Sequence, residues 1–184
     1  VLSDGRGACW GSNGSGERGD GTRTDRLLVV LATGVTDAIA VGAGDGFTCI
    51  LRSGGGVACA GDASAGRLGN GTTSGTQTTF QDVMGVTDAV QLSVGRRHAC
   101  ARNATGVVTC WGDDNRDGRL GRPPSDGAGA PAPVADLPAA AEIAAGVVAT
   151  CIVAEGGAVW CWGPQGGSPD GWRPRRVEGL FDAW

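Results

Sequence analysis

The chain has 184 residues, a mass of 18.3 kDa and a formal net charge of -4 at pH 7, and every basic residue is arginine. This acidity argues against a nucleic-acid binder, because such proteins need a cationic surface that displaces counterions. Hydrophobic residues make up 41% of the chain and charged residues 18%, a balance that is too apolar for a disordered protein. The longest apolar run, Leu27–Ala32, is far shorter than the roughly 20 residues of a membrane span.

The seven cysteines recur at an almost constant interval. The first series, with spacings of 51 and 51, is Cys49, Cys100 and Cys151. The second series, with spacings of 50, 51 and 51, is Cys9, Cys59, Cys110 and Cys161. A glycine stands five residues before each member of the first series and four residues before each member of the second. Self-similarity at a period of about fifty residues is typical of repeat folds such as propellers.

In chain order, each unit predicts short strands separated by turns. The first strand is an apolar or alternating run, at Ala38–Val41, Ala89–Leu92 and Ala141–Ala144. Two further strands, Phe47–Arg52 and Val57–Ala60, flank a glycine-rich turn, and the later hairpins turn at Asn103–Gly106 and Glu155–Gly157. Ala139–Ala145 has the composition of a helix, but its register with the other units predicts a strand. The predicted fold class is all-β, with propeller blades of about 51 residues.

Three segments of one unit carry a family resemblance. They are Gly95–Cys100 (GRRHAC), Val107–Gly112 (VVTCWG) and Gly118–Gly121 (GRLG). Together they resemble the repeat of the regulator of chromosome condensation family, whose members form seven-bladed propellers. Gly66–Thr72 and Val86–Val90 are similar to other parts of the same repeat.

The sequence also departs from this repeat. The histidine of the repeat is present only as His98, with Phe47 and Ala149 at the equivalent positions. The fourth unit lacks the Gly-Arg-Leu-Gly segment around Gly166.

The resemblance implies two different roles. Some bacterial members inhibit secreted enzymes such as beta-lactamase, whereas the eukaryotic exchange factors act on a nuclear GTPase. Exclusive use of arginine with abundant alanine and glycine indicates a GC-rich, bacterial genome. The acidic composition and the paired cysteines disfavour the nuclear role, so we expect the bacterial secreted type.

The register of the units divides the chain into one propeller region, 1–184. It contains a partial unit 1–31, repeats at about 32–82, 83–133 and 134–176, and the start of the next repeat at 177–184. Both ends fall inside a unit, so we expect three intact cysteine hairpins within part of a longer, seven-bladed propeller. A symmetric dimer that forms one ring and a compact four-bladed ring are the alternatives.

The paired cysteines face each other in the predicted hairpins. In an antiparallel hairpin, the residue numbers of two facing residues add up to the same total along the whole hairpin. The midpoints of the three cysteine pairs fall inside the predicted turns, so the two cysteines of each pair face each other. We therefore predict the disulfides Cys49–Cys59, Cys100–Cys110 and Cys151–Cys161. Such bonds indicate an oxidising compartment, extracellular or at the cell surface. The facing partner of Cys9 would precede Val1.

The same cysteines make a poor metal site. Nine residues separate the members of each pair, which does not match zinc spacing, and His98 is the only histidine. Asp113–Gly118 has oxygen ligands at alternate positions, but Pro124 stands where a calcium loop needs glutamate. We expect no metal and no cofactor.

Tryptophan and arginine supply the remaining candidates. Trp10, Trp111 and Trp162 recur in register and predict packing between blades. Residues outside the repeat pattern, with the composition of an interaction hot spot, are Trp172, Arg173, Arg175 and Arg176. Arg96, Arg97 and His98 are further candidate contacts with a partner. The alternative for His98 is a structural, hydrogen-bonding role, which is the more common one at that position of the repeat.

No nucleophile elbow or phosphate loop is present, and no spacing pairs His98 with a nucleophile, so we expect no enzyme. The first functional hypothesis is a secreted or cell-surface propeller that binds a protein through its loops. An inhibitor of a secreted enzyme is one form of that hypothesis. The alternative is a structural protein whose incomplete blades are completed by neighbouring copies. No nucleic-acid partner and no membrane span are expected.

Overall fold

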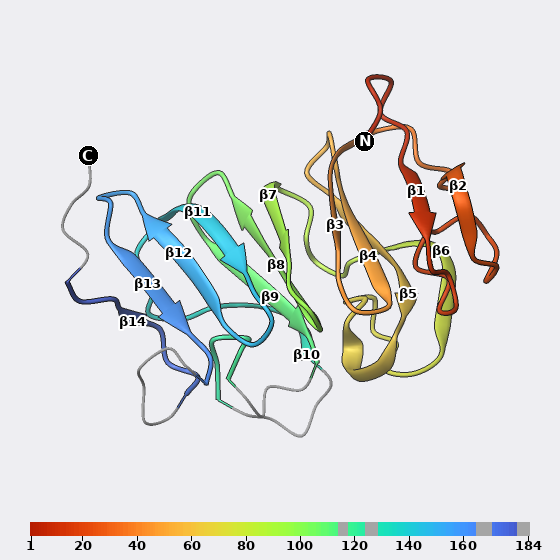
Figure 1. Ribbon diagram of the computed structural model, residues 1–184. Coiled ribbons are helices and arrows are strands. Elements are labelled where there is room, and N and C mark those ends of the chain that lie inside the picture. Colours follow the sequence, from red (N-terminus) through yellow and green to blue (C-terminus); the bar gives the residue numbers. More distant parts are fainter. Residues whose placement is uncertain (114–117, 124–128, 165–170, 180–184) are drawn as a thin grey trace.

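The computed structural model describes residues 1–113, 118–123, 129–164 and 171–179. The described chain forms four antiparallel sheets that stand side by side (Figure 1). The first has two strands, β1 (Ala8–Gly11) and β2 (Arg26–Leu31). The second has four, in the order β3 (Ala38–Ala43), β4 (Phe47–Arg52), β5 (Val57–Asp62) and β6 (Thr76–Asp82), with a 3-10 turn η1 (Ser64–Gly66) before β6.

The third and fourth sheets repeat this topology. The third contains β7 (Ala89–Val94), β8 (His98–Asn103), β9 (Val108–Gly112) and β10 (Gly129–Pro133). The fourth contains β11 (Ala140–Ala145), β12 (Thr150–Ala154), β13 (Val159–Trp162) and β14 (Arg175–Arg176). The first strand of the third sheet, β7, contacts the first strands of both neighbouring sheets, β3 and β11. This arrangement confirms the all-β propeller class. The alanine-rich segment forms the strand β11, as its register with the other units predicted, and not the helix that its composition would favour.

The hairpin turns explain why glycine precedes the second cysteine of each pair. Gly106 has a φ of 82°, a left-handed conformation that glycine adopts without strain. A Cβ at Gly106 would lie 2.6 Å from the backbone nitrogen of Ala140, which donates a hydrogen bond to the Gly106 carbonyl. Gly55 has the same conformation and a similar contact, with the carbonyl of Thr87 at 2.8 Å. Each of these turns therefore holds the entry of the next sheet.

All three predicted disulfides are present. Cys49 joins Cys59, Cys100 joins Cys110 and Cys151 joins Cys161, each with a Cα–Cα distance of 4.1 Å between directly facing residues. The bonds cross-link the second and third strands of each complete sheet. Cys9 is a free thiol, and burial raises its pKa.

The core lies between adjacent sheets. One buried cluster joins the second and third sheets and contains Trp111, and another joins the third and fourth and contains Trp162. Each indole covers a glycine of the preceding unit: a Cβ at Gly69 would lie 2.8 Å from the Trp111 ring, and one at Gly121 would lie 3.0 Å from the Trp162 ring. The predicted packing of these two tryptophans between blades is confirmed.

Trp10 does not follow this prediction. Its side chain is 67% exposed, although it holds the same register position as Trp111. The reason is that the residues against which the indole packs belong to the preceding unit, as Gly69 does for Trp111. The described chain has no unit before β1. Apolar residues of β2, including Leu27 at 98% exposure, are exposed on the same two-stranded sheet.

Candidate interaction surface

The strand register brings several loops to one end of the sheets. In the third sheet, His98 pairs with Gly112, so the loops that follow β7 and β9 leave at the same end. The pair Phe47 with Gly61 is equivalent to this one, and Thr150 with Trp162 lies one position further into the fourth sheet, so the corresponding loops of these sheets leave at the same end. We call this end the loop rim, defined as the segments that follow β3, β5, β7, β9, β11 and β13. It carries Arg96, Arg97, Trp172 and Arg173.

Arg96 and Arg97 are exposed on the loop rim, but each faces a carboxylate. Arg96 Nε donates to Asp45 Oδ2 at 3.3 Å, and Arg97 Nη1 lies 3.0 Å from Asp113 Oδ2. The backbone nitrogen of Asp45 donates to the Arg96 carbonyl at 2.7 Å, and that of Arg96 donates to the Gly146 carbonyl at 3.1 Å. These bonds join the loops of three successive sheets, so Arg96 and Arg97 offer little unpaired positive charge.

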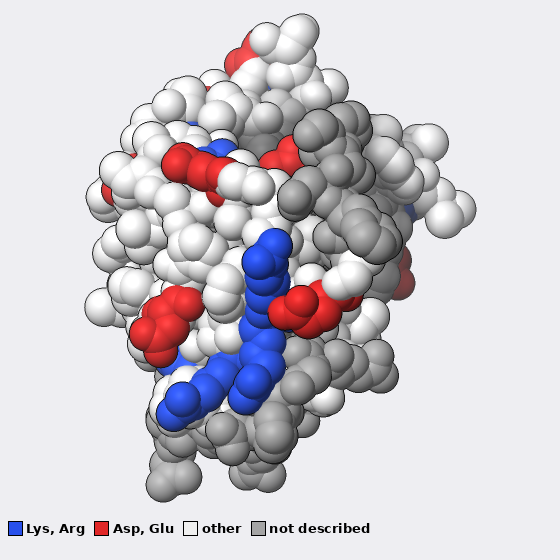
Figure 2. Space-filling view, turned by 90° about the vertical axis from the view of Figure 1, so that its left-hand side faces the viewer, with Lys and Arg blue, Asp and Glu red and all other residues white. Residues whose placement is uncertain are grey.

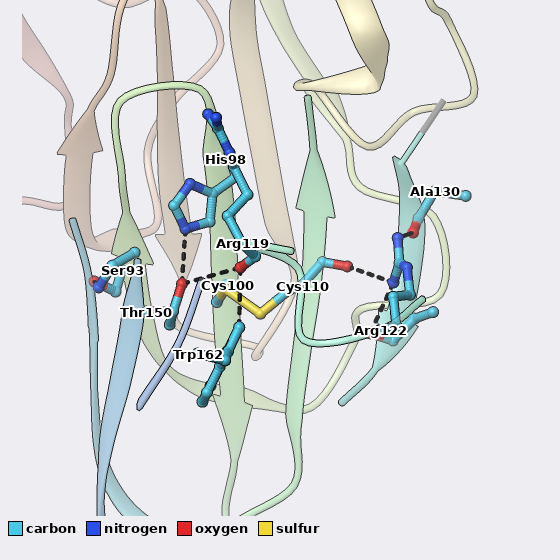
Figure 3. Close-up of a disulfide and its surroundings, with 11 residues drawn as sticks. Ser93, His98, Cys100, Cys110, Arg119, Arg122, Ala130, Thr150 and Trp162 are labelled. Carbon is cyan, nitrogen blue, oxygen red and sulfur yellow. Dashed lines mark hydrogen bonds between the residues drawn. A yellow bond between two sulfur atoms is a disulfide. The ribbon is translucent and has the colours of Figure 1, made fainter. Parts of the chain in front are cut away.

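His98 lies in the interior, which corrects its prediction as a partner contact. Its side chain is fully buried, and Nε2 lies 2.8 Å from Thr150 Oγ1 of β12. The Thr150 hydroxyl and Trp162 Nε1 both donate to the Arg119 carbonyl, at 3.2 and 2.9 Å (Figure 3). Because the hydroxyl donates its one proton there, it accepts from His98 Nε2. This chain of bonds ties the third sheet to the fourth.

The environment of His98 is structural rather than catalytic. Burial, together with the nearby charge of Arg119, lowers the pKa of His98 to about 4, so the imidazole is neutral at pH 7. Its partner Thr150 is also fully buried. A hydroxyl and an imidazole that solvent does not reach cannot act on an external substrate.

The arginine of the Gly-Arg-Leu-Gly segment is also structural. Arg67 is buried, and its Nη1 donates to the Asp45 carbonyl at 3.1 Å and to Asp62 Oδ2 at 2.8 Å. Burial by itself would raise the pKa of Asp62, but hydrogen bonds from Ser64 and the charge of Arg67 outweigh it and lower that pKa. Arg67 therefore fixes the loop rim from inside.

The strongest candidate contact surface lies around β14. Arg175 and Arg176 are exposed and pair with Cys161 and Trp160 of β13 at the outer edge of the fourth sheet. Arg173 stacks over the Trp172 ring, with its guanidinium carbon 4.8 Å from the ring centroid. The face that carries β13 and β14 shows a strip of basic side chains with acidic groups on either side (Figure 2). We call Trp172, Arg173, Arg175 and Arg176 the β14 patch.

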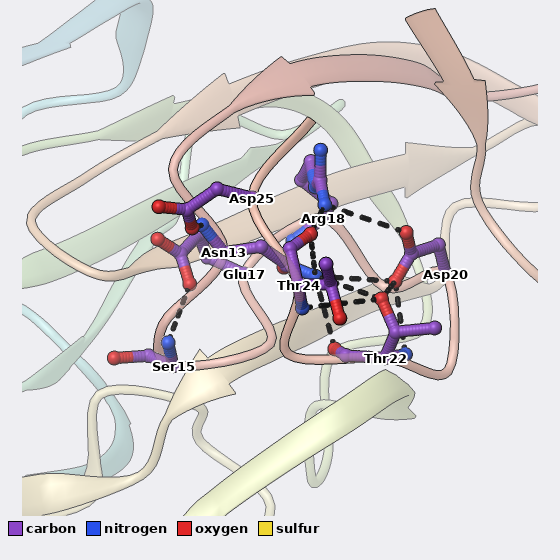
Figure 4. A network of polar contacts seen from close by, with 8 residues as sticks. All are labelled: Asn13, Ser15, Glu17, Arg18, Asp20, Thr22, Thr24 and Asp25. Carbon is purple, nitrogen blue, oxygen red and sulfur yellow. Dashed lines mark hydrogen bonds and ion pairs between the residues drawn. The ribbon is translucent and has the colours of Figure 1, made fainter. Parts of the chain in front are cut away.

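Sequence reasoning missed a polar network between β1 and β2. Asn13 is fully buried, donates from Nδ2 to the Thr22 carbonyl at 3.0 Å and accepts from the Arg18 backbone nitrogen at 3.0 Å (Figure 4). Asp20 accepts from Thr22 and lies 3.6 Å from Arg18 Nη2. Burial by itself would raise the pKa of Asp20, but hydrogen bonds from Thr22 and Asn13 and the charge of Arg18 together outweigh it and lower that pKa.

Arg18 has a sequence signal that an alignment of the units would have shown. The segment Gly16–Gly19 reads GERG, so Arg18 takes the position of Leu68 and Leu120 in the Gly-Arg-Leu-Gly segments. Both leucines are fully buried, and Arg18 is only 2% exposed. A charged side chain thus occupies a core position of the repeat.

The described residues form neither a metal cluster nor a membrane-spanning helix. In ranges 1–113, 118–123, 129–164 and 171–179, no three His, Cys, Asp or Glu side chains gather as a metal site would require. Residues 114–117 of the calcium-loop candidate, and Pro124 at its twelfth position, lie outside these ranges. The described part of the chain also has no helix long and apolar enough to span a membrane.

The architecture is similar to that of known proteins. A family model for the regulator of chromosome condensation (RCC1) repeat matches residues 89–119, the segment that holds His98, the Cys100–Cys110 disulfide and Trp111. Human WBSCR16 superposes with a TM-score of 0.78 at 17% identity, over 92% of this chain and 46% of that one. Prp20p from Saccharomyces cerevisiae superposes with a TM-score of 0.78 at 16% identity, over 93% and 46%.

This chain has the RCC1-type propeller fold. It spans less than half the length of these solved structures. Prp20p has binding properties towards Gsp1p and histones. A second structure holds yeast RCC1 (Prp20) with Kap60 bound, and it superposes with a TM-score of 0.74 at 16% identity, over 93% of this chain and 44% of that one. RCC1-type propellers thus include proteins that bind other proteins.

Proposed function

We propose that this chain is a non-enzymatic, protein-binding part of a seven-bladed RCC1-type propeller, with the unit boundaries predicted above. The observation that carries the proposal is the combination of disulfide-linked sheets with a loop rim that they hold rigidly in place. Rigid sheets that present loops are suited to recognition, since the loops carry specificity. Three intramolecular disulfides support an oxidising location, which we propose is extracellular or at the cell surface.

The β14 patch is the proposed contact. Among the described residues, neither Arg175 nor Arg176 forms an ion pair, in contrast to Arg96 and Arg97. Tryptophan and arginine are the side chains that dominate the binding energy of protein interfaces. Exposed cations at the edge of an otherwise acidic protein fit a partner with an acidic surface.

Charge reversal tests this contact. The variant Arg175→Glu/Arg176→Glu is compared with the wild type and with Arg26→Glu, which changes an exposed arginine on the equivalent outer strand β2. Extracellular proteins of the source organism are passed over each immobilised protein, and the bound proteins are identified. We expect a partner that the wild type and Arg26→Glu capture and the double variant loses. Equal capture by all three proteins contradicts the β14 patch as the contact.

Inhibition of a secreted enzyme is the finer form of this proposal. The family resemblance supports it, and an acidic enzyme surface would fit the β14 patch. Adding the protein to secreted hydrolases, beta-lactamase among them, should lower turnover in proportion to occupancy. If every enzyme that the protein binds keeps its turnover rate, the protein binds a partner but does not inhibit it.

A structural, self-assembling role is the second candidate, and the exposed apolar side chains of the first sheet favour it. Trp10 and Leu27 lie largely in solvent on a sheet of only two strands. Large exposed apolar surfaces mark interaction sites, and unpaired sheet edges invite further strands. The particle mass of the purified 184-residue chain in solution tests this role, since a multiple of 18.3 kDa is expected for an assembly and a single 18.3 kDa particle contradicts it.

A further inference from the structure

The first sheet has an open edge where the complete sheets have two more strands. By register, β1 and β2 correspond to β5 and β6, so strands equivalent to β3 and β4 are absent beside β1 in the described chain. The turn that leads into β1 is nevertheless formed. Leu2 N donates to the Arg6 carbonyl at 2.9 Å and Gly5 N to the Leu2 carbonyl at 3.0 Å, the same two bonds that close the Arg52–Gly56 turn between β4 and β5.

This turn fixes the register of any strand that would pair with β1. Leu2 takes the position of Arg52, the last residue of β4. In the second sheet, the residue three positions before Arg52 is Cys49, which faces Cys59. A strand in the same register would place its corresponding residue opposite Cys9.

A cleft of about 590 Å³ lies along this open edge, between Ala8–Trp10 on one side and Val41–Thr48 on the other. In complete sheets the equivalent space holds a disulfide that is covered by the first strand of the next sheet: Ile143 packs on the cluster that contains Cys100 and Cys110. Val41 lies on the corresponding first strand β3, facing the cleft, but it is 46% exposed, whereas Ile143 is 5% exposed. The cleft therefore has the position of a strand that would pair with β1. Val41, the residue that would cover such a strand, is already in place.

Arg18 gives an independent sign that something polar enters the cleft. Its side chain lines the cleft and is almost completely buried, yet among the described residues Nε and Nη1 have no hydrogen-bond partner. Nη2 bonds to the Thr24 carbonyl and faces Asp20. A buried guanidinium with two unsatisfied nitrogens is costly, so an occupant that brings a backbone carbonyl or a carboxylate is favoured.

We propose that the cleft binds a two-stranded β segment of the same type as β3 and β4, and that a cysteine on its second strand forms a disulfide with Cys9. The two thiols lose two protons and two electrons, and an external disulfide oxidant, such as oxidised glutathione, accepts them and becomes two thiols. A strand, rather than a small molecule, is the occupant that fits the observations. These are the register set by the turn, the Cys9 thiol, the exposed Val41 on the far side of the cleft and the unsatisfied nitrogens of Arg18.

The repeat itself supplies the probe. Val1 and Leu2 already take the positions of Leu51 and Arg52, so the probe ends at residue 50. A synthetic peptide of residues 38–50 covers the rest of both missing strand types and contains one cysteine, Cys49, which is activated as a mixed disulfide with thionitrobenzoate. The Cys9 thiolate attacks the peptide sulfur, the new disulfide forms, and the coloured thionitrobenzoate thiolate leaves and is measured. The control peptide exchanges Cys49 and Ile50, which keeps the composition but turns the cysteine to the opposite face of the strand.

We expect the native-register peptide to react at least about tenfold faster than the control peptide, because ladder hydrogen bonds hold its cysteine at Cys9. Cys9→Ser should abolish the reaction with both peptides. Equal rates for the two peptides would overturn the proposal. A Cys9–Cys9 dimer that forms without peptide would also overturn it, since the edge would then belong to a second copy.

Discussion

At the scale of single residues, Trp10 and Trp111 form a matched pair. They hold the same register position, yet Trp111 is fully buried on Gly69 and Trp10 is largely exposed. Trp111→Ala should lower the free energy of unfolding by about 3 to 5 kcal/mol, because it opens a cavity between two sheets. Trp10→Ala should change it by less than about 1 kcal/mol.

Urea unfolding of the two variants measures this difference. Loss of partner binding by Trp111→Ala with unchanged stability would show that this indole is a ligand platform instead. Equal destabilisation by both substitutions would show that Trp10 is covered in solution.

His98 makes stability depend on pH. Its pKa is lowered from 6.5 to about 4 in the folded protein, so the unfolded chain binds more protons in between. The stabilisation is fully present above pH 6.5 and is lost as the pH falls towards 4. His98→Phe, which installs the residue found at position 47, removes this titration. The wild type should therefore lose up to about 3 kcal/mol more than His98→Phe across this range.

Thermal unfolding at several pH values between 7 and 4 compares the two proteins. The carboxylates titrate in both, so only the difference between the two profiles reports on His98. Parallel profiles would mean that His98 is solvated in the folded protein.

At the scale of the structural element, the hairpin glycines separate backbone strain from packing between sheets. Gly106 and Gly157 both have a φ near 80°, so alanine costs about 1 kcal/mol at either position. A Cβ at Gly106 also meets the backbone of Ala140 at 2.6 Å, whereas one at Gly157 meets nothing within 4 Å. We expect Gly106→Ala to cost a further 1 to 3 kcal/mol or so. Equal melting temperatures for the two variants would argue against this contact.

The disulfides are the second element-scale test. Replacing Cys100 and Cys110 together by serine should lower the free energy of unfolding by about 2 to 3 kcal/mol, since the closed loop is short. Cys9→Ser is the control and should have little effect, because Cys9 forms no disulfide within the described chain. A double variant as stable as the wild type would mean that the pair is not oxidised in the protein.

The repeat made the elements predictable and the surfaces much less so. Register alone gave the strands, the cysteine pairs and the strand at Ala140–Ala145, because the same side chains recur at the same depth in each sheet. It misplaced Trp10, since burial there depends on a neighbouring unit rather than on local pattern. For His98 it offered a surface contact and a structural hydrogen-bonding role, and the structure has the second; its partner Thr150, 52 positions away, was not identified. The unit boundaries and the β14 patch stay predictions.

At the scale of the whole molecule, successive sheets share their cores and their loops. The described chain has three complete sheets and one half-sheet, and it spans less than half of the RCC1-type structures that it matches. Among the described residues, the three most exposed large apolar side chains, Leu27, Leu28 and Trp10, lie on the half-sheet. The open edge of β1 and the free Cys9 are therefore properties of one incomplete element, and the β14 patch lies on the opposite side of the sheet row (Figure 1).

The central claim is that disulfide-linked propeller sheets act outside the reducing cytosol, with Cys9 engaged by a further strand. Non-reducing peptide mapping of the protein isolated from its natural source tests this most directly. We expect the bonds Cys49–Cys59, Cys100–Cys110 and Cys151–Cys161, with Cys9 joined to a cysteine outside residues 1–184. Free thiols at the six paired positions, or crossed connectivity among them, would contradict it.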